Sequence, residues 1–417
     1  MTTTKNNEHK KLNFSSEREQ SQACLNSAEH EKNQGRKVLN VPNLRFPEFQ
    51  GEWEKNTLGD ISEFSKDRLN SKELSCDNYV ATENMLQDYQ GIVAASKIPS
   101  STNVIKFSKG DVLLSNIRPY LKKVWYADRD GGCSADVFVF KALSACIPDF
   151  LHYVIANDRF INFAMSGTKG VKMPRGDKEQ MKTYEIGLPS IEEQKKIAKL
   201  LSLLDERITT QNKIIEDLKE LKAAIIEIEY TPNTKTTSPI GDVIEQISKR
   251  NKNNAIKNVL SVSNRQGFIK QSDQFENRNI ASEDTSNYKI VEQNDFAFNP
   301  ARINVGSIAR LTTFEKGIVS PMYICFRTQG NVVPEYIDYY FESKHFYCEI
   351  QKRLEGSVRQ CLSFEGLCNI PLSLPSFEMQ QRIGKRLFTL GQKIKTETDL
   401  LELLNKQKQY LLRQMFI

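Results

Sequence analysis

The stretch LPSIEEQKKIAKLL, residues 188–201, occurs a second time in nearly the same form as LPSFEMQQRIGKRL, residues 374–387. Eight of the fourteen paired positions are identical. Earlier segments match at a similar offset, GDISEFSKDR from Gly59 with GDVIEQISKR from Gly241. A chain of 417 residues is long enough for two or three domains. The repeat therefore predicts a tandem duplication of one unit.

A long amphipathic helix is predicted after each LPS tripeptide. Ser190 and Ser376 are typical N-cap residues, and Glu193 completes a capping box where the second copy has Met379. Apolar residues then recur at alternating steps of four and three, and both copies place polar residues at the same two steps. The predicted seam consists of Ile197, Leu201, Leu204, Ile208, Ile215, Leu218, Ile225, Ile383, Leu387, Leu390, Ile394, Leu401, Leu404 and Leu411. This heptad pattern predicts that the helices pair as a coiled coil, antiparallel because the intervening segment returns the chain. The alternative is that each helix packs on its own globular half.

The remaining segments are predicted to be mixed α and β. Runs such as DVFVFKA, residues 136–142, and DFAFNP, residues 295–300, have the residue types of strands, and Pro148 and Pro334 each open a helix. The predicted fold class is α+β, with two globular mixed α/β domains joined by two long helices in an antiparallel coiled coil, and an internal pseudo-twofold repeat. The predicted boundaries are a polar, disordered leader of residues 1–40, a first domain of 41–188, a first spacer helix of 189–230, a second domain of 231–374 and a second spacer helix of 375–417.

Composition argues against several classes of protein. The 58 basic and 52 acidic residues leave a net charge of +6, which by itself supports nucleic-acid binding only weakly. The eight cysteines form no CxxC pair and the four histidines are scattered, so we expect buried, reduced cysteines and no structural metal. No run of about 18 apolar residues and no secretory signal is present. The sequence therefore predicts a cytoplasmic protein with no membrane partner.

Catalytic motifs are weak. Asn299-Pro300 matches only part of the Asn-Pro-Pro-Tyr motif of amino-methyltransferases, and no glycine-rich cofactor loop precedes it. Asp149 with Glu193 superficially fits the PD-(D/E)xK pattern of nucleases, but both residues are predicted at helix starts instead of on adjacent strands. No GxxxxGK[ST] loop, GxSxG elbow or HExxH motif occurs. The sequence favours a non-catalytic binding module; the alternatives are an adaptor protein without DNA contact and a stand-alone nuclease.

Several stretches together resemble the DNA-specificity subunit of type I restriction-modification systems. They are VPNLRFPEFQGEW (41–53), SNIRPYLKKV (115–124), FNPARINVGSI (298–308), GIVSPMY (317–323) and the two LPS copies. The resemblance covers nearly all of the chain after about residue 40. It implies that each globular half is a target recognition domain, and that the two domains read the two halves of a bipartite, asymmetric site in double-stranded DNA.

The resemblance also implies the partners. The coiled coil would set the distance between the domains and dock two modification (methyltransferase) subunits, with restriction subunits, the motor and nuclease, in the full complex. The chain would direct adenine methylation and restriction without a catalytic centre or a cofactor of its own. S-adenosylmethionine, ATP and magnesium would belong to the partner subunits.

Candidate DNA-binding residues are basic, aromatic, amide and hydroxyl side chains in predicted loops, because such groups contact phosphates and base edges. In the first half they are Arg118, Tyr120, Lys122, Lys123, Lys169, Lys172 and Arg175, and in the second half Arg302, Asn304, Ser357, Arg359 and Gln360. The alternative for each is a solvated surface side chain, and Arg118, which precedes Pro119, could be a structural anchor. No catalytic or metal-binding residue is predicted.

Overall fold

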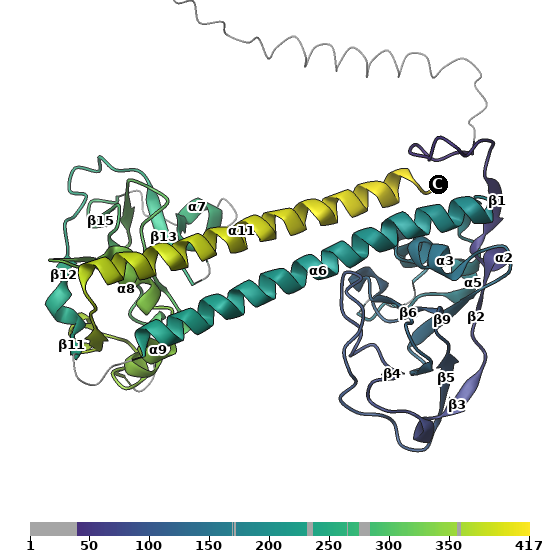
Figure 1. Ribbon diagram of the computed structural model, residues 1–417, viewed down its shortest axis with the longest axis horizontal. Coiled ribbons are helices and arrows are strands. Elements are labelled where there is room, and N and C mark those ends of the chain that lie inside the picture. Colours follow the sequence, from purple (N-terminus) through teal and green to yellow (C-terminus); the bar gives the residue numbers. More distant parts are fainter. Residues whose placement is uncertain are drawn as a thin grey trace, which may run out of the picture. The chain divides into compact units, whose positions relative to one another are not determined.

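The computed structural model describes residues 40–168, 170, 172–231, 237–264, 266–274, 284–356 and 360–417. The chain divides into two compact units, Met1–Asp205 with Lys406–Ile417, and Glu206–Asn405. Each unit holds one globular domain and parts of two long helices, α6 (Ile191–Tyr230) and α11 (Phe377–Gln414), as Figure 1 shows. The predicted leader lies outside the described residues except for Asn40.

The described residues of the first domain form two four-stranded sheets and one two-stranded sheet. Its strands are β1 (Glu54–Thr57), β2 (Ser62–Phe64), β3 (Arg68–Asn70), β4 (Tyr79–Val80), β5 (Asn103–Phe107), β6 (Val112–Ser115), β7 (Val124–Tyr126), β8 (Gly131–Cys133), β9 (Val137–Ala142) and β10 (Glu185–Leu188). Its short helices are α2 (Leu58–Ile61), α3 (Pro148–Ile155), α4 (Asp158–Ser166), α5 (Lys178–Lys182), and the 3₁₀ turns η2 (Ser71–Glu73) and η3 (Pro119–Leu121). The strand orders are β2-β9-β6-β7, β3-β5-β8-β4 and β1-β10.

The second domain repeats this plan. Its strands are β11 (Thr237–Pro239), β12 (Ile244–Ile247), β13 (Val259–Ser263), β14 (Gly267–Lys270), β15 (Lys289–Glu292), β16 (Phe296–Phe298), β17 (Ile308–Arg310), β18 (Lys316–Val319), β19 (Ile324–Thr328) and β20 (Pro371–Ser373). Its short helices are α7 (Gln271–Gln274), α8 (Pro334–Tyr340), α9 (Lys344–Gln351), α10 (Phe364–Cys368), η4 (Ile240–Val243) and η5 (Ile303–Val305). The strand orders are β12-β19-β16-β17, β14-β13-β18-β15 and β11-β20.

The two domains differ in one of their sheets. Both contain a parallel pair, β4 with β8 and β13 with β18, and an antiparallel neighbour, β5 or β15. In the first domain the fourth strand, β3, pairs with β5, whereas in the second domain β14 pairs with β13. The common three strands therefore carry their fourth strand on opposite edges, which is where the duplicated domains have diverged.

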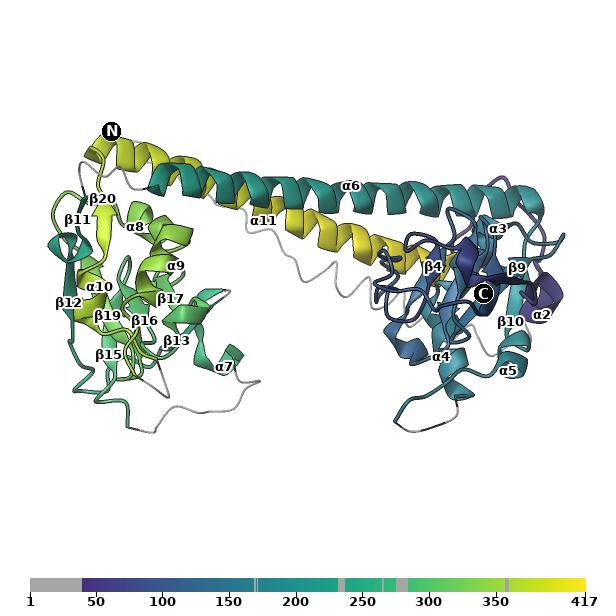
Figure 2. The same ribbon diagram turned by 90° about the horizontal axis from the view of Figure 1, so that it is seen from below.

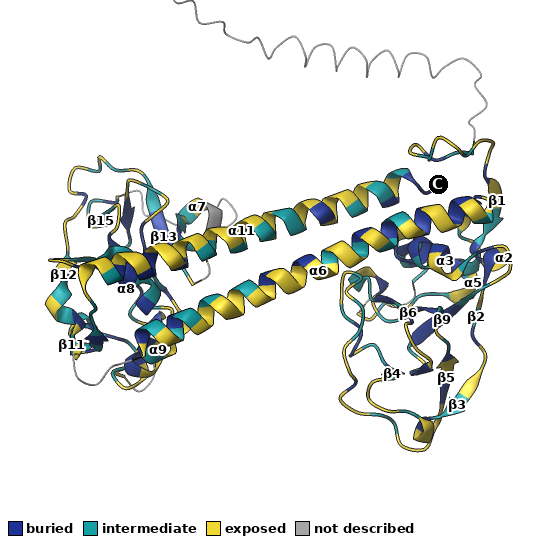
Figure 3. Ribbon diagram, in the orientation of Figure 1, coloured by how far each residue is buried: buried dark blue, intermediate teal, exposed yellow. Residues whose placement is uncertain are grey.

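The long helices complete the cores of both domains. The first core combines aromatic residues such as Phe150 with Ile197 and Leu201 from the start of α6 and Phe416 after the end of α11. Phe416 stacks on Phe150 with ring centroids 5.2 Å apart. In Figure 3 buried positions recur at intervals along each helix, between exposed positions. The start of α6 thus packs on the first domain, as expected if each helix packs on its own globular half.

The second core repeats this arrangement. It takes Ile383 and Leu387 from the start of α11 and Tyr230 from the end of α6. Tyr230 lies against Tyr336 with ring centroids 4.8 Å apart, at the repeat-equivalent place of the Phe416 and Phe150 pair. In each unit, therefore, the start of one long helix and the end of the other cover the same globular core.

The helices also pair with each other, and they are antiparallel. In the second unit Gln211 Nε2 donates to Glu397 Oε2 at 2.5 Å, and Arg386 Nη2 lies 2.6 Å from Glu229 Oε1. Residue numbers rise along α6 as they fall along α11, which defines the direction. All fourteen predicted seam residues occupy buried or half-buried positions. The predicted fold class, two mixed α/β domains with two long helices, is confirmed; Figure 2 shows the helices from a second side.

Lys222 and Lys408 are equivalent polar residues within the otherwise apolar seam, and each has a specific partner. Lys222 Nζ forms an ion pair with Glu342 at 2.6 Å and lies over the ring of Tyr339. Its equivalent, Lys408, pairs with Asp205 at 2.5 Å and lies over the ring of Tyr153. Each lysine therefore fixes a long helix against a tyrosine of the globular domain in its own unit.

The proline-opened helices are broken, contrary to the single helix expected in each half. Asn157 caps α4 by accepting a hydrogen bond from the backbone N–H of Arg159 at 2.9 Å. Ser343 caps α9 by accepting from the backbone N–H of Phe346 at 3.1 Å. Asn157 and Ser343 occupy equivalent positions of the repeat, at the same offset as the two LPS copies. The break is thus part of the duplicated scaffold, because a capping side chain competes with the helical backbone at this position.

The predicted capping box of Glu193 is only half formed. Ser190 Oγ accepts from the backbone N–H of Glu193 at 3.4 Å, but both carboxylate oxygens of Glu193 bind the Arg45 guanidinium at 2.7 Å. Arg45 belongs to the segment before β1, and sequence reasoning did not connect it with this helix. Glu193 therefore fastens that segment to α6, which also removes it from the nuclease pattern considered above.

An identical glutamine in each LPS copy links the long helix to the domain. Gln194 Oε1 accepts from the backbone N–H of Ile147, and Gln380 Oε1 accepts from that of Val333, at 2.9 and 3.0 Å. Ile147 and Val333 are the N-cap residues of α3 and α8. The glutamine side chains thus satisfy helix N-termini whose proline-led first turns lack a capping side chain.

The burial of His152 predicts that the stability of the protein depends on pH. It lies on α3 against Tyr126 and Tyr153, and burial, assisted by the charge of Lys408, lowers its pKa to about 4, whereas Asp205 acts in the opposite direction. Because the unfolded chain binds this proton near pH 6.5, its contribution to stability is complete above that pH and is lost as the pH falls toward 4. We expect a loss of up to about 3 kcal/mol from this group.

The measurement is urea unfolding of the wild-type chain and of the His152→Gln variant at pH 7.5 and 4.5. The decrease in the free energy of unfolding should be smaller in the variant, since glutamine does not titrate. An equal decrease in both proteins would contradict the assignment to His152.

Candidate functional site

The same turn occurs in both domains between two antiparallel strands of one four-stranded sheet, β2-β9-β6-β7 in the first domain and β12-β19-β16-β17 in the second. In the first domain β6 is followed by Arg118, η3 and Lys122 before β7, and in the second β16 is followed by Arg302, η5 and Gly306 before β17. Lys122 and Gly306 both adopt the left-handed conformation, with φ of 53° and 85°. The structure therefore places Arg118 and Arg302, two of the predicted DNA-binding residues, at equivalent positions.

A second loop lies beside the turn in each domain. The backbone N–H of Gly176 donates to the carbonyl of Asn116 at 3.2 Å, and that of Leu362 donates to the carbonyl of Pro300 at 3.1 Å. These two hydrogen bonds are repeat-equivalent. In the first domain the Arg118 N–H also donates to the Pro174 carbonyl at 2.8 Å. The structure thus brings together, in each domain, the two loops that were predicted separately from the sequence.

The described candidates differ in exposure. Exposed members are Arg118, Tyr120, Lys172, Arg175, Arg302 and Gln360, and half-buried members are Asn304, Lys122 and Lys123. Arg175 is an exposed member with an ion pair, to Asp136 at 3.3 Å. Lys169, Ser357 and Arg359 lie outside the described residues. The exposed groups give each domain basic and hydrogen-bonding side chains on two adjoining loops.

Two of the predicted DNA-binding side chains, those of Lys122 and Lys123, have partners within the protein. Lys122 Nζ lies 2.8 Å from Asp158 Oδ1, and Lys123 Nζ donates to the carbonyl of Thr82 at 2.6 Å. The Tyr89 hydroxyl donates to Asp158 at 3.0 Å. Although burial acts to raise it, the pKa of Asp158 is lowered by the hydrogen bonds from Lys122 and Tyr89. Lys122 thus ties the turn to α4, and Lys123 ties it to the segment after β4, which favours a structural role for both lysines.

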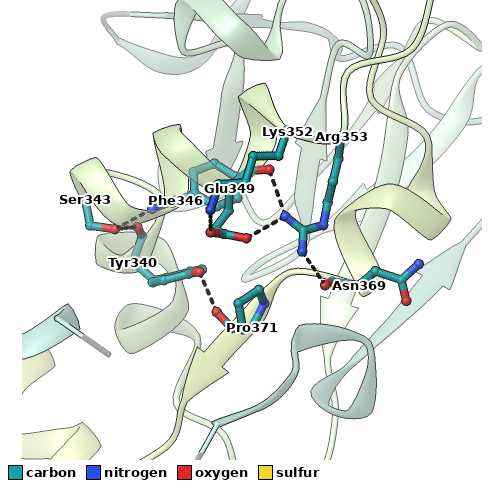
Figure 4. Close-up of polar contacts among 8 residues, drawn as sticks. All are labelled: Tyr340, Ser343, Phe346, Glu349, Lys352, Arg353, Asn369 and Pro371. Carbon is teal, nitrogen blue, oxygen red and sulfur yellow. Dashed lines mark hydrogen bonds and ion pairs between the residues drawn. The ribbon is translucent and has the colours of Figure 1, made fainter. Parts of the chain in front are cut away.

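A charged cluster anchors the second loop of the second domain (Figure 4). Arg353 Nη1 donates to Glu349 Oε2 at 2.5 Å, and its Nη2 donates to the carbonyl of Asn369 at 3.0 Å. Lys352 Nζ donates to the other oxygen of Glu349 at 2.5 Å. Burial acts to raise the pKa of Glu349, but these hydrogen bonds and charges lower it overall. Arg353 therefore joins the end of α9 to the residue after α10. Arg353 itself lies shortly before the loop that carries Gln360.

A further set of positioning residues was missed by sequence reasoning. Arg310 at the end of β17 is buried, and its guanidinium donates to Asn294 and Glu335 at 2.7 Å and to Asp338 at 3.1 Å. Burial raises the pKa of Asp338, and Arg310 partly offsets this. The cluster holds the strand after the turn against α8. The only signal was the spacing of the repeat, which places Arg310 at the position of Tyr126.

Other sites are absent from the part of the chain that the structure describes. It contains no group of three or more histidine, cysteine or acidic side chains that could hold a metal ion. No helix in these residues combines the length and the apolar composition of a membrane span. Cys133, Cys146 and Cys325 are buried, but Cys76 and Cys348 are exposed, so the expectation of buried cysteines is wrong for these two.

Comparison with protein families gives two matches along the chain. Residues 50–220 and 232–406 each match the family described as "Type I restriction modification DNA specificity domain". The type I restriction enzyme MjaVIII specificity subunit of Methanocaldococcus jannaschii is 26% identical over 421 residues, which cover 88% of this chain and 90% of that protein. The putative MjaX specificity subunit of the same organism is 25% identical and covers 63% of this chain and 64% of that protein.

Solved structures agree with the fold. The S subunit of a type I restriction-modification system from M. genitalium superposes with a TM-score of 0.59 at 16% identity, covering 90% of this chain and 99% of that one. A structure described under complex assembly and conformational transition of the type I R-M system gives a TM-score of 0.51 at 18% identity, covering 86% and 96%. At these identities the likeness concerns the fold.

Proposed function

The chain belongs to the type I restriction-modification DNA specificity family, and from this premise we propose that its two domains read the two halves of a bipartite, asymmetric site in double-stranded DNA. As a specificity subunit it is a DNA-recognition protein, and the catalytic activities lie in other chains of such complexes. The observation that carries the proposal is the turn with its adjoining loop. Its backbone has equivalent turns and hydrogen bonds in both domains, but its exposed side chains differ. Equal scaffolds with different exposed side chains suit two different half-sites.

The long helices are proposed to set the separation of the half-sites and to dock two modification subunits. Support comes from apolar side chains that the helix pair leaves exposed. Ile214, Leu221 and Ile228 follow one another at steps of seven along α6, and 39%, 51% and 75% of their surfaces are exposed. A heptad stripe outside the seam suits contact with another protein. Restriction subunits would join the full complex, and S-adenosylmethionine, ATP and magnesium would be bound by partner subunits in the cytoplasm.

The test is to co-express the chain with modification subunits of its own system and to map methylated adenines in the host genome. We expect one asymmetric motif of two short parts separated by unread base pairs, and no methylation by this chain alone or by the modification subunits alone. Specific binding by the complex should weaken steeply between about 50 and 200 mM salt, as phosphate contacts require. A continuous motif, or binding that is insensitive to salt, would refute the proposal and favour an adaptor protein.

A further inference from the structure

The repeat allows the side chains at the candidate turn to be compared position by position. The first residue of each 3₁₀ turn, Pro119 or Ile303, is buried, and the residue after each turn is left-handed. The closing backbone hydrogen bonds are also equivalent, Lys122 N–H to the Pro119 carbonyl at 2.8 Å and Gly306 N–H to the Ile303 carbonyl at 2.9 Å. The two turns therefore present their remaining side chains from the same framework.

Arginine precedes the 3₁₀ turn in both domains. Arg118 and Arg302 are exposed, and neither side chain has a hydrogen-bond or ion-pair partner among the described residues. The chain enters the turns differently, with φ of 51° at Arg118 and −136° at Arg302, yet both domains have the same side chain here. A left-handed φ is unfavourable for a residue other than glycine. A free guanidinium that both domains retain suits a ligand common to both half-sites, and that ligand is the phosphate backbone.

Two residues further on, the side chains differ. Tyr120 is 49% exposed, and its equivalent, Asn304, is half-buried at the surface of the second domain. An asparagine amide can form two hydrogen bonds with the N6 and N7 atoms of adenine in the major groove. A tyrosine offers one hydroxyl and an apolar ring, which suits other base edges, such as the methyl group of thymine. This is the position at which the shared framework carries different recognition chemistry.

We propose that Arg118 and Arg302 bind DNA phosphates, and that Tyr120 and Asn304 contact bases and determine specificity. This division of labour rests on the proposed function and deepens it. Within a single turn, the arginine would add the same binding free energy for every DNA sequence. The residue two positions later would distinguish one DNA sequence from another.

The arginine is tested with Arg118→Ala and Arg118→Lys in the complex with modification subunits. Arg118→Ala should weaken binding by about tenfold, both to a duplex that carries the motif recognised by the complex and to an unrelated duplex. It should also reduce the magnitude of the slope of log affinity against log salt concentration by about one. The methylated motif should stay the same. Arg118→Lys should restore most of the affinity, because a phosphate accepts a point charge whereas a bidentate guanine contact does not.

Lys55→Ala is the matched control, since Lys55 is an exposed cation on β1, outside the turn. It should leave affinity within about twofold and the salt slope unchanged. A new base preference in the first half-site of Arg118→Ala would overturn the assignment to phosphate. An unchanged salt slope in Arg118→Ala would overturn it as well.

The specificity residues are tested by exchange, Tyr120→Asn in one variant and Asn304→Tyr in another. Tyr120→Asn should change the base preference in the first half-site only, and Asn304→Tyr in the second only. If a variant complex methylates too little DNA for mapping, selection of bound duplexes from a randomised library gives the same readout. Wild-type base preferences in both variants would overturn the inference. That result remains distinct from failure of the proposed function, in which the wild-type complex itself would show no bipartite motif.

Discussion

Seven residues inserted into each long helix at the same level are expected to widen the unread gap of the methylated motif by about three base pairs. Seven residues of α-helix add about 10 Å and preserve the heptad seam, and successive base pairs are about 3.4 Å apart. Because the helices are antiparallel and Gln211 contacts Glu397, the matching sites are after Gln211 in α6 and immediately before Glu397 in α11. Methylome mapping of the double insertion measures the gap directly.

The control is an insertion of the same heptad in α6 alone. The unmatched helix would displace Tyr230 from Tyr336 or bulge out of the pair, so we expect a less stable protein and strongly reduced methylation. An unchanged gap in the double insertion, with methylation retained, would show that the helices do not set the spacing. Both half-sites should keep their sequences in either case.

Exchange of the complete first unit for that of a relative with another specificity is expected to replace the first half-site and leave the second half-site intact. The unit to exchange is residues 40–205 together with 406–417, because Leu412, Met415 and Phe416 belong to the core of the first domain. Arg159 adds polar contacts, its Nη1 donating to the carbonyl of Phe416 at 2.7 Å. The methylated motif of the chimaera is the readout.

A chimaera that exchanges only residues 41–187 provides the comparison. It would place Ile197, Leu201 and Phe416 against a foreign core, where mismatched packing typically costs about 1–3 kcal/mol per site. We expect a lower melting temperature and less methylation than for the complete exchange. If the complete exchange left the first half-site unchanged, the assignment of that half-site to the first domain would be wrong.

The long helices could be predicted from sequence because their pattern is local and occurs twice. Steps of four and three through Ile197, Leu201 and Leu204 recur in the second copy with the same polar exceptions. Periodicity indicates that a face is buried, but it does not identify what buries it. Ile197 proved to belong to a globular core, whereas Gln211 lies against the other long helix.

The partners of charged side chains could not be predicted, because they come from distant parts of the chain. Glu193 has the spacing of a capping box, yet Arg45, 148 residues earlier, binds it. Lys122 has the residue type of a DNA contact, yet it forms an ion pair with Asp158. Such choices depend on tertiary distances, which neither spacing nor residue type contains.

The candidate turn lies between these cases. Arg118 and Arg302 have the residue type of DNA contacts in the sequence, but the offset between the repeats varies along the chain, so spacing alone does not establish that the two residues are equivalent. The matching 3₁₀ turns and loop contacts establish their equivalence. Gln194 and Gln380 were visible as identical residues in the two LPS copies, but their bonds to the N-termini of α3 and α8 required the structure.

The contact between Gln211 and Glu397 has a consequence for self-association. These residues are repeat equivalents, so a homodimer of two first halves would place glutamine opposite glutamine, and one of two second halves would place two carboxylates together. Like charges at such a central position destabilise the pair, whereas an amide can donate to a carboxylate. Divergence after the ancestral duplication has thus left the two halves better suited to each other than to copies of themselves, which disfavours pairing of α6 with α6, or of α11 with α11, between neighbouring chains.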